Sequence, residues 1–338
     1  GGQAEAGSEG RLPAITRLLL MVAPLLLAAA APVAAQGPTA VRVAADNDAF
    51  NFWLPPWDRP DREYTSGARG TLEYAGRPGW PVWPRLSRDA SRVSSHSFSI
   101  GQAIYTGVRE PNIFARPNDW KGDGQDRVRP NAGWLYIEAG ERDSTARATT
   151  ELAVAVGVVG PPALAEQMQR FFHSLGPEFQ RPVDWTRQLP FEPGFVARYT
   201  RTSTVGTFGD ANRWRGAFTT ELGGSAGTIL TALSAGAGVT TDVALGGSPA
   251  SAAAPHLAFT AGLSGRFVVR DEFLDGTIFR TSDRVAKQPI VSEGRFAVTF
   301  RWRQLGVTYR ATHTGRQYDG QVQAASWGTI QTEWRFGR

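Results

Sequence analysis

The chain has 338 residues, including 38 Gly, 18 Phe and 11 Trp, while 20% of residues are charged and the formal net charge is +5. Cysteine is absent, which excludes disulfides and thiolate metal sites, and the absence of Lys/Arg-rich runs argues against nucleic-acid binding. An aromatic-rich chain with many glycines and few charges fits a large β-structure, and its modest positive charge is compatible with anionic lipid headgroups.

The N-terminal region is predicted to be a secretory signal peptide. Arginines precede an apolar core at residues 18–31, and small residues at 33–35 offer a cleavage site. A transmembrane anchor is the alternative, but Pro24 interrupts the core, which then runs directly into the small residues. We therefore assign residues 1–35 to an N-terminal extension and signal peptide, and residues 36–338 to the mature domain.

Beyond this segment, apolar and polar residues alternate in many stretches. Phe296, Val298 and Phe300 share one face of such a stretch, whereas Ala297 and Thr299 share the other. A period of two predicts β-strands, and apolar-out, polar-in alternation is typical of outer-membrane barrels. The predicted strands, about twelve, cover residues 40–45, 68–74, 96–105, 133–140, 149–159, 194–202, 214–222, 228–240, 257–269, 289–302, 305–314 and 325–336.

A soluble β-sandwich would show the same period with its apolar face turned inward. Strands long enough for a tilted span of the bilayer, with aromatics near their ends, favour a barrel, and a lipid-facing sheet must close on itself. We therefore predict an all-β fold, a closed antiparallel transmembrane β-barrel of about 12 strands in the bacterial outer membrane. Trp134 and Trp334 are expected to be interfacial anchors. Arg301 and Arg310 are expected to point inward, and a small porin remains an alternative.

A short helix is predicted after the strand at residues 149–159. Gly160-Pro161-Pro162 ends the strand, and residues 163–174 are rich in helix formers. His173 then lies on the last turn of a short helix outside the sheet. A histidine after two phenylalanines can also be a packed or surface residue, but its ordinary pKa suits a general base near neutral pH.

Several motifs follow one another along the chain: Asn47-Asp48-Ala-Phe50, Asp61-Arg-Glu-Tyr64-Thr65-Ser66-Gly67, Gly101-Gln102-Ala-Ile-Tyr105-Thr106, Arg129-Pro130-Asn-Ala132-Gly133-Trp134-Leu135-Tyr136, Gly157-Val-Val-Gly160-Pro161 with His173, Glu192-Pro193-Gly194, Leu274-Asp275-Gly276-Thr277-Ile-Phe279 and Arg316-Gln-Tyr-Asp-Gly320-Gln321. Each motif is weak by itself. In order and spacing, from about residue 41 to 336, they together resemble the lipid A 3'-O-deacylase (LpxR) family of outer-membrane barrels.

This resemblance implies a monomeric barrel with a site on its extracellular side. The site would use Ca²⁺ to hydrolyse an acyl ester of lipopolysaccharide, with lipid A in the outer leaflet as partner. The family's catalytic histidine falls on His173. The other family positions fall on Asn47, Asp48, Thr65 and Gln169, and Glu178 matches an acidic residue shortly after the helix.

Ester hydrolysis requires a base, stabilisation of an oxyanion and an apolar slot for the acyl chain. We expect His173 to activate water as a general base, rather than a serine to act as the nucleophile. Asp48 and Glu178 can give hard oxygen ligands to Ca²⁺, and a bound cation polarises an ester carbonyl. Asn47 and Thr65 can orient the water or complete the anion cradle.

Structural roles are the alternatives for these residues. Asn47 and Asp48 can form a turn or cap, Thr65 can be a barrel-lining hydroxyl, and Gln169 can be helix surface. A family lysine is unmatched in the stretch that contains Arg109, which supports the alternative of an inactive barrel that binds lipopolysaccharide. Acidic residues in the long connection after residue 270 are expected to be solvated or to order that loop; they are Asp271, Asp275 and Asp283.

Overall fold

The computed structural model describes residues 37–52, 63–77, 86, 89, 91–107, 128–174, 185–210, 213–245, 254–321 and 324–336, without the side chains of residues 172 and 173. The predicted extension and signal peptide lie outside the described residues. None of the helices in the described part of the chain is long and apolar enough to cross a membrane.

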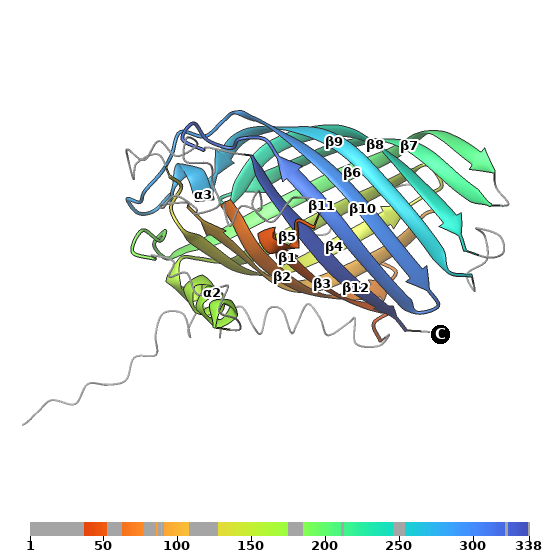
Figure 1. Ribbon diagram of the computed structural model, residues 1–338, viewed down its shortest axis with the longest axis horizontal. Helices are drawn as coiled ribbons and strands as arrows, with labels where there is room; N and C mark the ends of the chain where they lie inside the picture. Colours follow the sequence, from red (N-terminus) through yellow and green to blue (C-terminus); the bar gives the residue numbers. More distant parts are fainter. Residues whose placement is uncertain are drawn as a thin grey trace, which may run out of the picture.

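Twelve antiparallel strands form a closed barrel in which each strand pairs with its neighbours in the chain and β1 pairs with β12 (Figure 1). The strands are β1 (Ala40–Asn47), β2 (Glu63–Ala75), β3 (Val93–Thr106), β4 (Ala132–Ser144), β5 (Ala148–Val159), β6 (Glu192–Asp210), β7 (Trp214–Gly227), β8 (Leu230–Ala244), β9 (His256–Asp271), β10 (Ile290–Trp302), β11 (Leu305–Thr314) and β12 (Ala325–Arg335). The predicted fold class and strand number are confirmed.

Several strands are longer than the sequence pattern predicted. β6 continues to Asp210, although the predicted strand ended at residue 202. The continuation is rich in Thr and Gly, so its alternation is weak, yet it pairs with β7 along its whole length around a register shift between Thr204 and Gly206. Pairing with a neighbour, rather than local apolar content, therefore sets the strand length.

Apolar side chains face outward, as predicted. Phe296 and Trp302 on β10 are 45% and 44% exposed on the outer wall, while Ala297, Thr299 and Arg301 line a cavity inside the barrel. Other large apolar residues exposed on the outer wall are Val43, Leu72, Ile100, Phe195 and Leu263. Inside, the Glu138 carboxylate pairs with both Arg69 and Arg198. The lumen is therefore polar and ion-paired, as in outer-membrane barrels.

The two ends of the barrel differ. One end, which we call the loop end, carries the connections at residues 48–62, 107–131, 160–191, 272–289 and 315–324. The opposite end, the turn end, carries tight connections such as residues 145–147 and 303–304. The first and last described segments also meet at the turn end, where the Phe336 amide donates to the Thr39 carbonyl at 2.9 Å.

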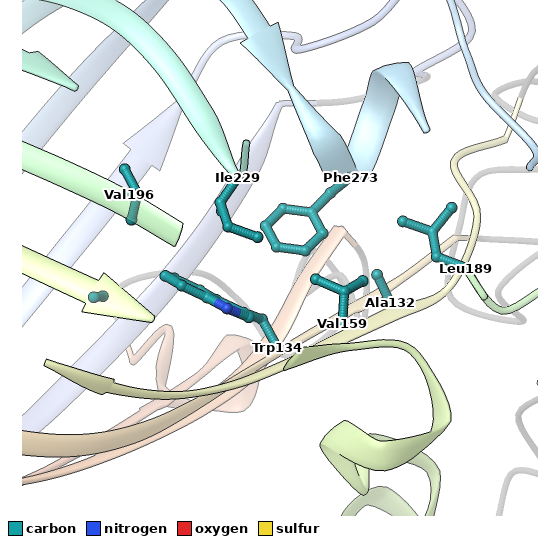
Figure 2. Packing of buried hydrophobic residues seen from close by; sticks show 8 residues of the cluster. Ala132, Trp134, Val159, Leu189, Val196, Ile229 and Phe273 are labelled. Carbon is teal, nitrogen blue, oxygen red and sulfur yellow. The ribbon is translucent and has the colours of Figure 1, made fainter. Parts of the chain in front are cut away.

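An apolar cluster fills the lumen at the loop end (Figure 2). Its buried members are Ala132, Trp134, Ala155, Val159, Leu189, Val196, Ile229 and Phe273. Below it lies a polar cavity of about 690 Å³ lined mainly by arginines, glutamates and hydroxyls, including Arg310 as predicted. A packed cluster across the lumen argues against the porin alternative.

The expectation for Trp134 was wrong. Trp134 is 6% exposed and shares the inward face of β4 with Glu138, so it packs in the lumen cluster instead of anchoring the outer wall. Trp334, which pairs with Val41 and Leu305, is 48% exposed on the outer wall near the turn end. Strand phase decides between the two environments, because successive side chains point to opposite faces.

The acidic residues after β9 order their loop, as expected. The Asp271 carboxylate caps the short helix α3 (Glu272–Asp275) by accepting from the Phe273 amide at 3.0 Å. Asp275 accepts from the Lys287 ammonium at 2.9 Å, and Asp283 pairs with Arg187 at 2.6 Å. These contacts fold the 272–289 connection over the lumen cluster that contains Phe273.

Candidate functional site

The predicted Asn-Asp pair lies where β1 ends. Asn47 is the last residue of β1 and the N-cap of the 3₁₀ helix η1 (Asp48–Phe50), since its Oδ1 accepts from the Ala49 amide at 2.7 Å. The Asp48 side chain is in the first turn of η1 and the residue is 5% exposed. Asn47 therefore serves as a cap, which holds Asp48 at the rim of the barrel.

The helix η1 lies against the outer wall at the loop end. Asn51, which follows it, donates through Nδ2 to the Ser326 carbonyl at 2.6 Å, and the Tyr309 hydroxyl donates to the Phe50 carbonyl at 2.7 Å. A Cβ at Gly328 would collide with Phe50. Glycine on the outward face of β12 thus lets the η1 backbone approach the wall.

Thr65 is next to a break in the β2–β3 register, which shifts between Tyr64 and Ser66. Its hydroxyl is hydrogen-bonded to the hydroxyl of Thr106, the last residue of β3, and each of the two threonines is 5% exposed. The bulge re-aims the strand end, as bulges do at barrel rims. Thr65 and Thr106 thus form a buried hydroxyl pair at the loop end.

The predicted helix leaves the top of β5 and turns back along the outside of the barrel. A 3₁₀ turn, η4 (Pro161–Ala163), leads into α2 (Ala165–His173), which lies beside the loop end in Figure 1. Gln102 on β3 donates through Nε2 to the Ala163 carbonyl at 2.5 Å, and Ile104 packs in a buried cluster with Ala165.

Gly133 on β4 leaves room for this helix, because a Cβ there would collide with Ala163 and Ala165. The prediction of a short helix outside the sheet is confirmed. Since α2 covers the outward faces of β3 and β4, it reaches back toward the wall that carries Thr65.

Gln169 has a fixed orientation on α2. It is 4% exposed, and its Oε1 accepts from the Trp185 indole N–H at 3.0 Å. Because an indole N–H can only donate, this bond assigns the amide oxygen and leaves Nε2 as the free end. Among the residues that the structure describes, Gln169 Nε2 is buried and has no hydrogen-bond partner. It is therefore a pre-oriented donor between the helix and the wall, rather than helix surface.

The other face of α2 is apolar and exposed. Met168 and Phe171, which are 38% and 56% exposed, have the spacing that aligns side chains on one helix face, and Leu164, just before the helix, is 50% exposed. Ile100, on the outward face of β3 below Gln102, is 59% exposed and belongs to the apolar outer wall. The exposed stripe of α2 thus continues the apolar surface of the barrel.

His173 is the last residue of α2, and its side chain is outside what the structure describes. Glu178 and Arg109 also lie outside the described residues. Within the described ranges, no group of three or more His, Asp or Glu side chains is arranged to hold a metal ion. Asp48 is therefore the single predicted calcium ligand that lies within the described residues, and the full set of calcium ligands stays a prediction.

The structure brings Asn47, Asp48, Thr65 and Gln169, the predicted site residues whose side chains it describes, to one end and one side of the barrel. Asp48 lies where β1 meets β12, Thr65 is on β2, and α2 lies over β3 and β4 with Gln169 facing the wall. These elements are consecutive around the barrel. We call this surface, from η1 to α2 on the outer wall at the loop end, the rim site.

Sequence reasoning assigned no role in the site to Gln102, Thr106 or Trp185. Gln102 and Thr106 alternate with Ile104 on the outward face of β3, so each is a polar residue in an otherwise apolar register. These polar residues at outward positions are the sequence signal that could have identified Gln102 and Thr106 as site residues. Trp185 has no such signal, because its contact with Gln169 depends on how the connection after α2 folds.

Two remaining motifs bind each other. The Glu192 carboxylate accepts from the Ile278 and Phe279 amides at 2.8 and 3.1 Å. Glu272 is fully buried beside this contact, and neither of its carboxylate oxygens has a hydrogen-bond partner within the described part of the chain. Burial, together with the charge of Glu192, raises the pKa of Glu272 to about 8.

A second set of contacts joins segments across the loop end. The Tyr318 hydroxyl donates to Glu63 at 2.7 Å, and the Arg129 guanidinium lies 3.5 Å from the same carboxylate. Arg129 also stacks on the Tyr105 ring, 4.6 Å from its centroid. The motifs around Glu63, Arg129 and Tyr318 therefore hold the loops together.

Comparisons with known proteins agree with this architecture. The family model described as "Outer membrane protein LpxR" matches residues 18–336. LpxR from Salmonella typhimurium is similar at a TM-score of 0.68 and 18% identity, covering 88% of this chain and 100% of that one.

More distant barrels are the β domain of the Bordetella autotransporter BrkA (TM-score 0.44, 10% identity, 89% and 99% covered) and the translocator domain of NalP from Neisseria meningitidis (0.39, 11%, 95% and 98%). The search of curated proteins found no match.

Proposed function

Because this chain belongs to the LpxR family of outer membrane proteins, we propose that it is a Ca²⁺-dependent hydrolase that removes a 3'-O-linked acyl chain from lipid A of lipopolysaccharide. The protein is an outer-membrane β-barrel, and long loops lie on the extracellular side of such barrels. The rim site is then at the level of the outer leaflet, where lipopolysaccharide resides.

One observation carries the proposal: buried polar groups lie on the outer wall, which is otherwise apolar. Asp48, Thr65 and Gln169 are each 4–5% exposed, at the loop end of a wall made of large apolar side chains. Buried polar groups on a lipid-facing surface are costly and mark function. A hydrolase that takes its substrate sideways from the membrane needs its polar groups on this wall.

Each residue of the rim site has its own role in the proposed ester hydrolysis. His173 on α2 is the general base that takes a proton from water, and Gln169 Nε2, held by Trp185, donates to the oxygen that gains charge. The Thr65 and Thr106 hydroxyl pair orients the polar part of the ester. The apolar stripe of α2 lies among the acyl chains and keeps bulk water from the site.

The donor chemistry at the rim fits calcium. Asp48 offers a carboxylate held in place by the Asn47 cap, and the neighbouring groups are hydroxyl and amide oxygens, which are the hard donors that Ca²⁺ prefers. Asp48 would hold the ion, with Glu178 as the further acidic ligand. The ion supplies Lewis-acid polarisation of the ester carbonyl.

Mass spectrometry of lipid A tests the activity. Cells that express the chain with calcium present should lose one ester-linked acyl chain from lipid A, and cells that express His173→Ala should not, because the general base is gone. Heat-modifiable migration of the variant is the folding control. If lipid A from wild-type cells keeps all its chains, the hydrolase proposal is wrong and the lipopolysaccharide-binding alternative is preferred.

Removal of calcium tests the cofactor separately. Purified protein in mixed micelles with lipid A should stop turning over after chelation and recover with Ca²⁺. Mg²⁺ should restore little activity, because it demands short, near-octahedral bonds and dehydrates reluctantly. Full turnover in the chelator would contradict the calcium assignment without affecting the role of His173.

A further inference from the structure

A hollow of about 930 Å³ lies on the outer wall, on the strands β7 to β11 next to the rim site. Small residues line it on neighbouring strands: Ala237 on β8, Ala261 on β9, Gly294 on β10 and Ala311 on β11. Large apolar side chains surround them, namely Phe52, Phe218, Leu263, Phe296 and Tyr309. We call this feature the wall hollow.

Strand register produces this shape. Both cross-strand neighbours of Phe296 are alanines, Ala261 and Ala311. Leu263 is flanked in the same way by Ala237 and Gly294. Directly paired side chains lie side by side on one face, so small partners leave depressions beside the two large residues.

The hollow runs obliquely from the loop end toward the middle of the wall. At one extreme it includes His313, next to the last residue of β11, and at the other Phe218, the fifth residue of β7 counted from the turn end. In an outer-membrane barrel the loop end faces the outer leaflet, so the His313 end of the hollow lies on that side. The lipids beside this end are lipopolysaccharide molecules.

The upper end of the hollow is polar and tied to the rim site. His313 Nδ1 is hydrogen-bonded to the Ser326 hydroxyl at 2.7 Å, and the Ser326 carbonyl accepts from Asn51 at 2.6 Å. The Phe52 ring packs on Tyr309 with centroids 5.5 Å apart. Asn51 and Phe52 directly follow η1, which begins at Asp48, so the hollow starts where the rim site ends.

We propose that the wall hollow seats one acyl chain of the lipopolysaccharide molecule bound at the rim site, a chain that is retained rather than cleaved. The inference rests on the proposed function for the identity of the lipid. A groove with an apolar body and a polar upper end matches a fatty acyl group, whose ester end lies near His313 and whose tail follows the alanines.

Shape, rather than hydrophobicity, selects the chain. In a bilayer every outward apolar residue already contacts lipid tails, so affinity for one chain must come from close van der Waals packing. A hollow with small residues at its floor and large side chains around them can contact a chain over more of its surface than a wall without such a depression can. The seat would thereby hold a multi-chain lipid in one orientation while another of its chains reaches Gln169 and His173.

Photocrosslinking in intact cells tests the seat. A benzophenone side chain is introduced in place of Ala261, and a matched control carries it at Ala226, which is exposed on the same outward face as Phe218 but does not line the hollow. We expect crosslinks to lipopolysaccharide at position 261 to exceed those at 226 several-fold. Equal yields at both positions, or capture of phospholipid at 261, would overturn the proposal.

A filling variant adds a kinetic readout. Ala261→Phe should raise KM for lipid A about 10-fold, the effect of losing good contacts in an apolar pocket, with kcat nearly unchanged. Ala226→Phe should behave like wild type. Unchanged kinetics for Ala261→Phe would contradict the seat. The crosslinking experiment is also run with the His173→Ala variant. A protein without deacylase activity then still shows whether the wall hollow binds an acyl chain.

Discussion

The lumen and the outer wall of this barrel carry opposite chemistry, and their exceptions differ in kind. The lumen is charged, and its exception is the apolar cluster around Trp134 and Phe273. The outer wall is apolar, and its exceptions are the buried polar groups of the rim site. An apolar plug in a lumen only closes and braces the barrel, whereas polar groups on a lipid-facing wall need a polar ligand. The exception on the wall therefore marks the function.

Two aspartates two residues apart give the strongest test of this comparison. Asp48 belongs to the rim site, while Asp46 faces inward and accepts from the Tyr64 hydroxyl at 2.7 Å. Asp48→Asn should lower lipid A deacylation on the order of 100-fold, because the carboxylate expected to hold calcium is lost. Asp46→Asn should keep most of the activity. Equal losses in an assay of purified protein would show that the lumen takes part in catalysis.

Substitutions in the ion pairs of the lumen should instead change the stability of the barrel. Glu138 has a side chain 2% exposed and pairs with Arg69 and Arg198, so Glu138→Ala leaves two guanidiniums facing each other. We expect the free energy of unfolding to fall by about 2 kcal/mol, less than for a fully dry pair because both arginines touch lumen water.

Glu151, whose pair with Arg142 is about half exposed, is the matched control in the same cavity. Its substitution by Ala should cost less than about 1 kcal/mol in denaturant titrations of the folded barrel in micelles. If Glu138→Ala is equally mild, the ion pairs of the lumen do not brace the barrel.

The hydrogen bonds from the Ile278 and Phe279 amides to Glu192 should be sensitive to pH. The pKa of Glu272 is raised by burial, then by the charge of Glu192, to about 8, above its ordinary value of 4.5. The folded loop therefore holds a proton that the unfolded loop releases, so this stabilisation is complete below about pH 4.5 and is lost as pH rises through about 8.

Hydrogen exchange of the Ile278 and Phe279 amides, which donate to Glu192, measures these contacts. Their protection factors should fall between about pH 4.5 and 8 in the wild type, the interval between the two pKa values of Glu272. Glu272→Gln cannot ionise and should keep its protection. A wild type whose protection does not depend on pH would contradict the assigned role of the Glu272 proton.

The smallest expected effect is on the support of Gln169. Trp185→Phe removes the indole N–H that holds Gln169 Oε1 but keeps most of the packing with Ile104 and Ala165. One neutral hydrogen bond is worth about 1 kcal/mol, so kcat should fall about 5-fold. A purely structural role would instead lower thermal stability and leave kcat of the folded fraction unchanged.

Much of this architecture could be predicted from the sequence because β-alternation is local. The Phe296–Trp302 register identified the outward face of β10, and Gly160-Pro161-Pro162 located the start of the helix that ends at His173. Trp134 shows the limit of such reasoning: an aromatic residue near a strand end suits either a membrane interface or a plugged lumen.

The sequence by itself determined the class of fold, the number of strands and the candidates for the site, because period-two patterns and turn residues act within a few positions. Only the tertiary structure decided which candidates share a surface. Closure of β1 on β12 and the bulge beside Thr65 set the phase of every strand end, and the return of α2 across β3 and β4 turns Gln169 toward the wall. These contacts join residues far apart in the chain, and register between strands, which no local pattern contains, is what brings them together.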